Sequence, residues 1–240
     1  MAGFLEDIIG DGSFGNDWKH RDITKAKIYN NDGYDTIVAF DQTKLWLDKS
    51  YTVFFQLNNV QGIRYLAFNY PTRKTNEWAI VVVPNGINFI RFAGGSQNVQ
   101  DLYYGWIGIN HAKRNNFSLR CDEFETELFV NGIPAVLTFF KNEIQGIQTS
   151  GTEPFYIGRA GFGTTNLVAN ISEFSIVNYA QSDAEIARDA ALGYQTANNP
   201  NNFLLNIDFN KNTGQNLTDT SPNNYTITSV GNKNFGNFYP

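Results

Sequence analysis

Short hydrophobic segments separated by turns occupy most of this chain, and in several of them every second residue is apolar. Residues 51–57 (YTVFFQL) show this pattern fully, and residues 125–130 (ETELFV) and 168–176 (VANISEFSI) show it in part. Such alternation is typical of a strand that buries one face. Its recurrence at regular spacing predicts an antiparallel β-sandwich or barrel. The expected strands cover residues 27–29, 36–40, 45–47, 51–57, 64–68, 78–83, 87–92, 103–109, 117–121, 125–130, 135–140, 155–157, 168–176 and 204–209.

Two asparagine–glycine pairs mark tight turns between these strands. Asn85-Gly86 lies between two apolar segments, and Asn131-Gly132 ends another. Hairpin loops of two residues need positive φ angles, which glycine and asparagine adopt at little cost. Both pairs therefore predict antiparallel hairpins.

One short helix is expected after the last long strand, where the chain reads Ser182-Asp183-Ala184-Glu185. The Ser182 side chain can cap the first turn while the Glu185 carboxylate reaches back to the backbone of residue 182. This reciprocal arrangement is a capping box. It predicts that a helix begins at this point.

Residues 1 to about 30 differ from the rest of the chain. Phe4, Leu5, Ile8 and Ile9 are apolar, and a glycine-rich stretch follows them. An arm that cannot bury its own apolar side chains must lie on its own domain or on a neighbouring subunit. We therefore divide the chain into an N-terminal docking arm, residues 1–30, and a sandwich domain, residues 31–240.

Three motifs in the second half of the chain form an ordered set. They are the Asn131-Gly132 turn, a strand that ends at Ile157-Gly158-Arg159, and the segment ISEFSIVNYAQSDAEI over residues 171–186. This set resembles the laminin-G-like, or concanavalin-A-like, family of lectin domains. The resemblance implies an all-β, antiparallel jelly-roll sandwich with one short helix, to which this chain adds the extended N-terminal arm.

A further motif lies near the C-terminus. The strand LLNIDF over residues 204–209 precedes Gly214 and then the turn DTSPNN over residues 219–224, where Pro222 replaces the glycine usual in the family. Its place after the helix is similar to the motif order in jelly-roll modules of bacteriophage virion proteins. The whole likeness covers roughly residues 35 to 235. It implies a structural component of a tail, baseplate, fibre or capsid decoration.

Charge and cysteine content narrow the possible partners. The net charge is −5, and lysine and arginine form no patch or stripe, so we do not expect a nucleic-acid partner. The single cysteine, Cys121, excludes an intrachain disulfide and a zinc site built from cysteines. No segment approaches the roughly 20 apolar residues that span a bilayer. The first residues lack the basic and apolar regions of a secretory signal, so we expect synthesis in a host cytoplasm and localisation in the virion.

The best candidates for a sugar-stacking surface are Tyr103, Tyr104 and Trp106, in the segment LYYGW. Aromatic rings offer flat apolar faces, and tyrosine and tryptophan add a polar group. The alternative is that these rings belong to the core, where most of the 20 Phe, 12 Tyr and 4 Trp residues must lie.

Calcium is a possible ligand of the loops, although no cofactor is required by the sequence. Calcium prefers six to eight oxygen ligands, and related sandwich domains bind it at one rim. Asp32, Asp35 and Asp219 are the candidate ligands, because each lies in a loop rich in aspartate and asparagine. The alternative is that these side chains stabilise turns by bonding to their own backbone.

The segment Glu123 to Glu127 places three glutamates at alternate positions. On a strand these would form a row of carboxylates, and retaining glycosidases need two carboxyl groups about 5 to 5.5 Å apart. The alternative is a solvated face opposite the inward residues Thr126 and Leu128. We favour the solvated face and expect no enzymatic activity.

Three functions remain open at this point. The favoured one is a non-enzymatic bacteriophage virion protein, with a lectin-like module for assembly or for contact with host-surface glycans. In that case the arm would contact other virion proteins, and the chain would form homo-oligomers within a particle. The alternatives are a free carbohydrate-binding module and a glycoside hydrolase that uses Glu123, Glu125 and Glu127.

Overall fold

The structure is a computed structural model with side chains. It describes residues 27–32, 36–39, 50–58, 64–68, 77–83, 86–92, 99–105, 115–122, 125–142, 155–157, 168–192, 199–208, 218–230 and 234–237. The expected strand over residues 45–47 and most of the N-terminal arm lie outside these residues.

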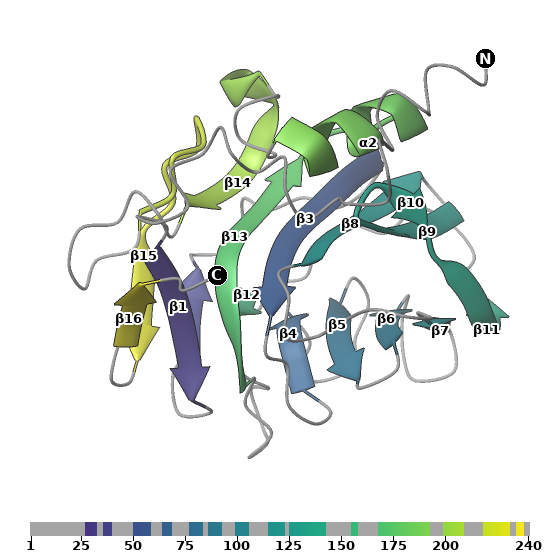
Figure 1. Cartoon of the computed structure of the whole chain (residues 1–240), viewed down its shortest axis with the longest axis horizontal. Coiled ribbons are helices and arrows are strands. Elements are labelled where there is room, and N and C mark those ends of the chain that lie inside the picture. Colours follow the sequence, from purple (N-terminus) through teal and green to yellow (C-terminus); the bar gives the residue numbers. More distant parts are fainter. Residues whose placement is uncertain are drawn as a thin grey trace.

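Among the described residues, the strands form two antiparallel sheets of eight strands each (Figure 1). In order, sheet A contains β10 (Ile133–Pro134), β9 (Glu125–Val130), β8 (Asn115–Asp122), β3 (Ser50–Asn58), β13 (Val168–Val177), β1 (Lys27–Asp32) and β16 (Asn234–Asn237), and β14 (Phe203–Asp208) pairs with β13. Sheet B contains β11 (Val136–Asn142), β7 (Val99–Gly105), β6 (Gly86–Phe92), β5 (Glu77–Val83), β4 (Arg64–Phe68), β12 (Phe155–Ile157), β2 (Thr36–Ala39) and β15 (Ile227–Val230). The expected all-β jelly-roll sandwich is confirmed.

Several boundaries differ from those expected. β1 begins at Lys27 and pairs with β13, so residues 27–30, which we assigned to the arm, belong to sheet A. β7 begins at Val99, earlier than expected. β10, β15 and β16 were not expected, because they are short and their sequences, IP, ITSV and NFGN, lack a clear alternation. Pairing with neighbouring strands creates them.

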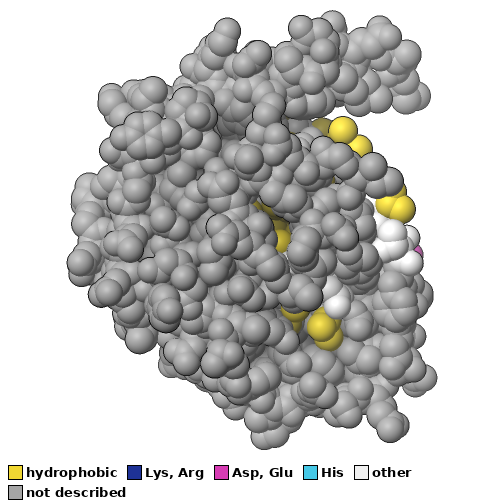
Figure 2. Space-filling view, turned by 60° about the horizontal axis from the view of Figure 1, so that its bottom comes forward, with side chains coloured by type: hydrophobic (Ala, Val, Ile, Leu, Met, Phe, Trp, Pro, Cys, Tyr) yellow, Lys and Arg dark blue, Asp and Glu magenta, His cyan; other side chains and the backbone are white. Residues whose placement is uncertain are grey.

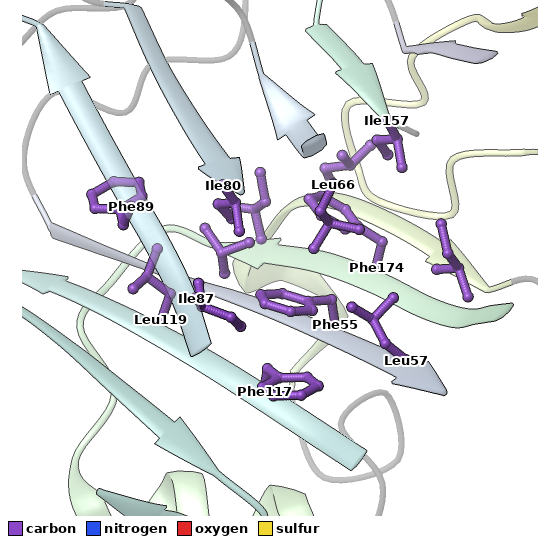
Figure 3. Packing of buried hydrophobic residues seen from close by; sticks show 14 of the residues in the cluster. Phe55, Leu57, Leu66, Ile80, Ile87, Phe89, Phe117, Leu119, Ile157 and Phe174 are labelled. Atoms are coloured by element: carbon purple, nitrogen blue, oxygen red, sulfur yellow. The ribbon is translucent and has the colours of Figure 1, made fainter. Parts of the chain in front are cut away.

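The space between the sheets is filled by large apolar side chains (Figure 3). Phe55 on β3 stacks on Phe117 of β8, with ring centroids 5.1 Å apart, and on Phe174 of β13, at 6.5 Å. Ile80 and Phe89 meet them from sheet B, and all five side chains are almost fully buried. Burying a side chain of this size contributes roughly 1.5–3 kcal/mol. The apolar residues at alternate positions of β3 therefore face the core, as the alternation over residues 51–57 predicts.

One edge of the sandwich is made by a single hairpin and its continuation. Asn131 (φ 53°) and Gly132 (φ 81°) form the expected turn between β9 and β10. Only Ala135 then separates β10 from β11, so the chain passes from sheet A to sheet B within one residue. The N–H of Ala135 donates to the carbonyl oxygen of Leu128 at 2.7 Å, which holds this crossing against β9.

The helix α2 (Asp183–Leu192) covers part of the outer face of sheet A. The expected capping box is present: the Ser182 N–H donates to Glu185 Oε2 at 2.8 Å, and the Glu185 N–H donates to Ser182 Oγ at 3.3 Å. Burial alone would raise the pKa of Glu185, but the hydrogen bonds from Ser182 outweigh it and hold that pKa below its ordinary value.

Polar contacts fix α2 to the sheet beneath it. Asn116 on β8 donates through Nδ2 to the carbonyl oxygen of Ala190 at 3.1 Å. Asp189, which is fully buried, accepts a hydrogen bond of 2.6 Å from Gln181 Nε2 and pairs with Arg188. The Gln181 N–H in turn donates to Thr52 Oγ1 on β3 at 3.0 Å. Buried polar groups with such partners fix the position of the helix.

Gly132 is the point where the hairpin touches the helix. A Cβ atom at this position would lie 3.1 Å from the Cα of Ala187 and 3.2 Å from the Cβ of Ala190. We expect Gly132→Ala to lower the free energy of unfolding by about 2 kcal/mol, because it adds this crowding to the strain of a positive φ. Urea unfolding followed by circular dichroism measures the loss.

Asn224→Gly is the matched control for that substitution. Asn224 is exposed and also has a positive φ of 47°, which glycine adopts without strain. We expect this variant to change the stability by less than about 0.5 kcal/mol. Equal stability of Gly132→Ala and the unsubstituted protein would contradict the contact between the hairpin and α2.

Candidate functional site

The outer face of sheet B carries the best candidate site among the described residues. On β6, Ile87 and Phe89 lie in the core, so Asn88 and Ile90 belong to the opposite face of the sheet. Strand register then places Asn88 opposite Val81 of β5 and opposite Tyr103 of β7. Directly opposed residues in antiparallel strands share a face.

The same register continues to the edge of the sheet. Tyr103 is opposite Phe139 of β11, so a row of positions across four strands contains Val81, Asn88, Tyr103 and Phe139. We call these four positions the Asn88 row. A second row beside it contains Ile90, Asp101 and Lys141. By strand register, the Asn88 row thus contains one asparagine position and two aromatic positions.

Asn88 is the residue of this row whose hydrogen bonding stands out. Its amide oxygen is shielded from solvent and has no hydrogen-bond partner. An unsatisfied acceptor of this kind costs about 1–3 kcal/mol, and its presence calls for an explanation such as a bound ligand. A ligand hydroxyl that donates to this oxygen would remove the cost.

Access to the outer face of sheet B increases towards β11. Ala79 and Val81 on β5 are buried, Asn88 and Ile90 on β6 are half-buried, and Val136 on β11 is exposed. A ligand would therefore reach this face over β6 and the start of β11 rather than over β5.

The three aromatic residues predicted to contact sugars fall at different places. Tyr104 is opposite Ile87, a core residue, whereas Tyr103 is opposite Asn88. Positions 103 and 104 therefore belong to opposite faces of sheet B, and position 103 belongs to the outer one. Trp106 lies outside the described residues. Sugar contact by these residues stays a prediction.

Asp219, predicted as a calcium ligand, anchors a turn beside β14. Its Oδ1 accepts hydrogen bonds from the N–H groups of Asn206 and Ser221, both at 2.9 Å. Its Oδ2 accepts from Ser221 Oγ at 2.7 Å and from the Tyr225 N–H at 2.9 Å. A carboxylate offers about four acceptor positions, and here each receives a donor. The turn-stabilising alternative therefore describes what Asp219 does in this structure.

Of the other two predicted calcium ligands, the structure describes only Asp32. Asp32 is the last residue of β1 and is opposite Val168 of β13, and Asp35 lies outside the described residues. Within the described ranges no three histidine, cysteine or carboxylate residues gather around a common point. Calcium binding stays a prediction.

The predicted carboxylate row lies on β9 in sheet A, whereas the Asn88 row lies on sheet B. Glu125 and Glu127 are exposed on β9, whereas Thr126 and Leu128 between and beyond them are buried. Glu127 Oε2 accepts a hydrogen bond of 3.0 Å from Arg120 Nε and forms an ion pair with the same guanidinium group. The expected solvated face is confirmed for these two glutamates, and Glu123 lies outside the described residues.

Sequence comparison finds no relative: no protein-family model matches the chain, and no curated protein matches it. Solved structures do match its fold. A Bacteroides ovatus protein proposed to bind carbohydrate superposes with a TM-score of 0.63 and 16% identity, over 86% of this chain and 58% of that protein. The heptameric SAP-like pentraxin of Limulus polyphemus superposes with a TM-score of 0.52 and 14% identity, over 71% of this chain and 83% of that chain.

These two likenesses concern the fold, because the sequences share so few residues. This chain spans 58% of the length of the Bacteroides protein, so that protein contains much that has no counterpart here. In the described part of this chain, no helix has the length and apolar character needed to cross a membrane. The comparisons therefore support the fold, an antiparallel jelly-roll sandwich.

Tyr225 makes the Asp219 turn sensitive to alkaline pH. Burial, and then the negative charge of Asp219, raise the pKa of Tyr225 to about 12, from an ordinary value of 10.0. Because the folded protein favours the neutral phenol, its stabilising effect is complete below about pH 10 and is lost as the pH rises towards 12. We expect thermal stability to fall in this interval.

Tyr225→Phe tests this expectation, because phenylalanine keeps the ring and removes the ionisable group. The fall in melting temperature between about pH 10 and 12 should be smaller in this variant than in the unsubstituted protein. Tyrosinate absorbance near its ultraviolet maximum should show one fewer late-titrating tyrosine. Identical pH profiles of the two proteins would contradict the assignment.

Proposed function

We propose that this chain is a non-enzymatic, lectin-like component of a bacteriophage virion that contacts glycans through the outer face of sheet B. The observation that supports the glycan site most directly is the unpartnered, shielded amide oxygen of Asn88. It lies in register with Tyr103 and Phe139, on the part of the sheet that is open towards β11.

The chemistry of this row suits a neutral sugar. A pyranose ring presents a flat face of C–H groups, which packs on aromatic residues, and hydroxyl groups at its edge, which donate to an amide oxygen. The second row adds one acidic and one basic residue, Asp101 and Lys141, at the border of the same face. Such a row offers apolar contact with a few polar groups to fix orientation.

The virion role is supported by the order of the sequence motifs and by the N-terminal arm. The jelly-roll motifs, with the DTSPNN turn placed after α2, follow the order seen in virion modules. The arm ends where β1 enters sheet A, so it is tethered directly to the sandwich. In this proposal the arm joins other virion proteins and leaves sheet B free to face outward.

Two features favour binding over hydrolysis. Glu127 is held by Arg120, which also donates to Asp183 Oδ1 at 2.6 Å, so this carboxylate belongs to an ion-pair network with the start of α2. Glu125 lies on the same exposed face of β9, away from the space between the sheets. A free carbohydrate-binding module would use the same sheet B face without an arm docked on other subunits.

Replacement of Asn88 separates binding from folding. We expect Asn88→Leu to weaken glycan binding at least about tenfold, because the ligand loses its acceptor, while thermal stability is kept or rises as the unsatisfied oxygen disappears. Tyr103→Ala should weaken binding further. A glycan array identifies the ligand, and titration calorimetry with that ligand measures both effects.

Asn178→Ala is the control for those variants, because Asn178 is an exposed asparagine beyond the end of β13 in sheet A. It should bind glycans as the unsubstituted protein does. Unchanged affinity of Asn88→Leu would place the sugar elsewhere. No signal for the unsubstituted protein on any glycan of the array would overturn the lectin-like function itself.

The virion assignment has its own test. We expect peptides of this chain in the proteome of purified phage particles, at a fixed ratio to the other structural proteins. A variant that lacks residues 1–26 should fold but be missing from particles, since the arm provides the attachment. Incorporation of this truncated chain at the normal ratio would contradict the docking role of the arm.

A further inference from the structure

The turn between β9 and β10 contains a pair of residues that are chemically reactive as well as suited to a hairpin. Asn131 precedes Gly132, and both have positive φ angles. The backbone nitrogen of a glycine is not shielded by a side chain, so it can approach the carboxamide carbon of the preceding asparagine. The proposed glycan site does not use this pair, which lies at the end of sheet A.

The turn lies at the surface, where water can reach it. Asn131 and Gly132 are half-buried, and the neighbouring Ile133 is 54% exposed. Figure 2 shows described side chains at the surface along its right-hand rim, the side on which Figure 1 places β9 and β10. Exclusion of solvent therefore does not protect the pair, and any protection must come from the way in which the Asn131 side chain is held.

The side chain of Asn131 is hydrogen-bonded at both ends to β8. Its Oδ1 accepts a hydrogen bond of 2.9 Å from the N–H of Asn116, and its Nδ2 donates to Asn115 Oδ1 at 3.1 Å. The backbone N–H of Asn131 also donates to the carbonyl oxygen of Asn116, at 2.8 Å. The carboxamide thus reaches across to the neighbouring strand. It must break both of its hydrogen bonds before its carbon can turn towards the nitrogen of Gly132.

The same residues connect the turn to α2. Asn116, which holds Asn131, is only 3% exposed and donates through Nδ2 to the carbonyl oxygen of Ala190. Gly132 lies so close to the helix that an added Cβ atom would come within 3.1 Å of Ala187 and 3.2 Å of Ala190. A change in the side chain of Asn131 or in the length of the turn would therefore act on the helix.

We infer that the Asn131-Gly132 turn is a latent deamidation site, which the folded hairpin protects and whose reaction loosens α2. In this reaction the nitrogen of Gly132 loses its proton and bonds to Cγ of Asn131, while the bond from Cγ to Nδ2 breaks and ammonia leaves. Water then opens the succinimide ring at one of its two carbonyl carbons, which gives aspartate or isoaspartate. One water is consumed and one ammonia is released, so the reaction needs no other reactant.

Both products lose contacts that hold the turn. Each has a carboxylate in place of the carboxamide, and so has no donor for Asn115 Oδ1. Isoaspartate also inserts one carbon into the backbone next to Gly132, where α2 leaves little space. Because the reaction requires the turn to open, its rate in the folded protein is the rate in the unfolded chain multiplied by the fraction of turns that are open.

Ageing of the full chain at mildly alkaline pH, in buffer and in concentrated urea, tests the protection. Peptide mass spectrometry of timed samples should show that Asn131 reacts at least about tenfold faster in urea, because only the open turn reacts. Asn85, which also precedes a glycine, provides the reference rate of an unprotected pair in the same urea samples. Equal rates at Asn131 in buffer and in urea would overturn the inference.

Asn131→Asp, which carries the side chain of one product, tests the effect on α2. Amides of residues 183–192 should exchange with solvent at least about tenfold faster in this variant than in the unsubstituted protein. Asn224→Asp is the matched control, because Asn224 is exposed and also has a positive φ, and it should leave exchange in α2 unchanged. Unchanged exchange in folded Asn131→Asp would also overturn the inference. The ageing experiment uses the unsubstituted protein, so it decides the question even if this variant fails to fold.

Discussion

The stacking of Phe55 between Phe117 and Phe174 is the contact on which the rest of the sandwich depends. These rings lie on three adjacent strands of sheet A and fill the space that faces Ile80 and Phe89 of sheet B. Because both sheets bury their inward faces against this one cluster, the outer faces are free to differ. Sheet A uses its outer face to hold α2, and sheet B leaves part of its own accessible.

The hydrogen bonding of polar groups also differs from one part of the sandwich to another. The outer face of sheet A is bonded to α2 and to the residue Gln181 before it, through Asn116 Nδ2, Arg120 and Thr52. At the Asp219 turn, the carboxylate of Asp219 accepts four hydrogen bonds from nearby groups of the protein, so its acceptor positions are filled. The amide oxygen of Asn88 on sheet B has no hydrogen-bond partner, and the same is true of the amide oxygen of Asn116 beneath α2. What distinguishes Asn88 is its place on a sheet face that opens towards β11.

The sequence predicted the architecture well, because alternation, asparagine–glycine turns and a helix cap are local signals. It identified the strand around Phe55, the turn at Asn131 and the start of α2 at Ser182. It did not reveal β15 and β16, which are short and polar and exist only through pairing. Nor could it show that positions 103 and 104 belong to opposite faces, or that Asn88 is unsatisfied, since both depend on which strands become neighbours.

The close approach of Gly132 to α2 carries an evolutionary consequence. Because Ala187 and Ala190 occupy the volume beside this turn, the hairpin and the helix restrict each other's sequences. A homologue with a side chain at the turn must have shifted its helix or lost the methyl groups beneath it. Substitutions at these three positions should therefore be correlated among descendants of this chain, although more than fifty residues separate Gly132 from the two alanines.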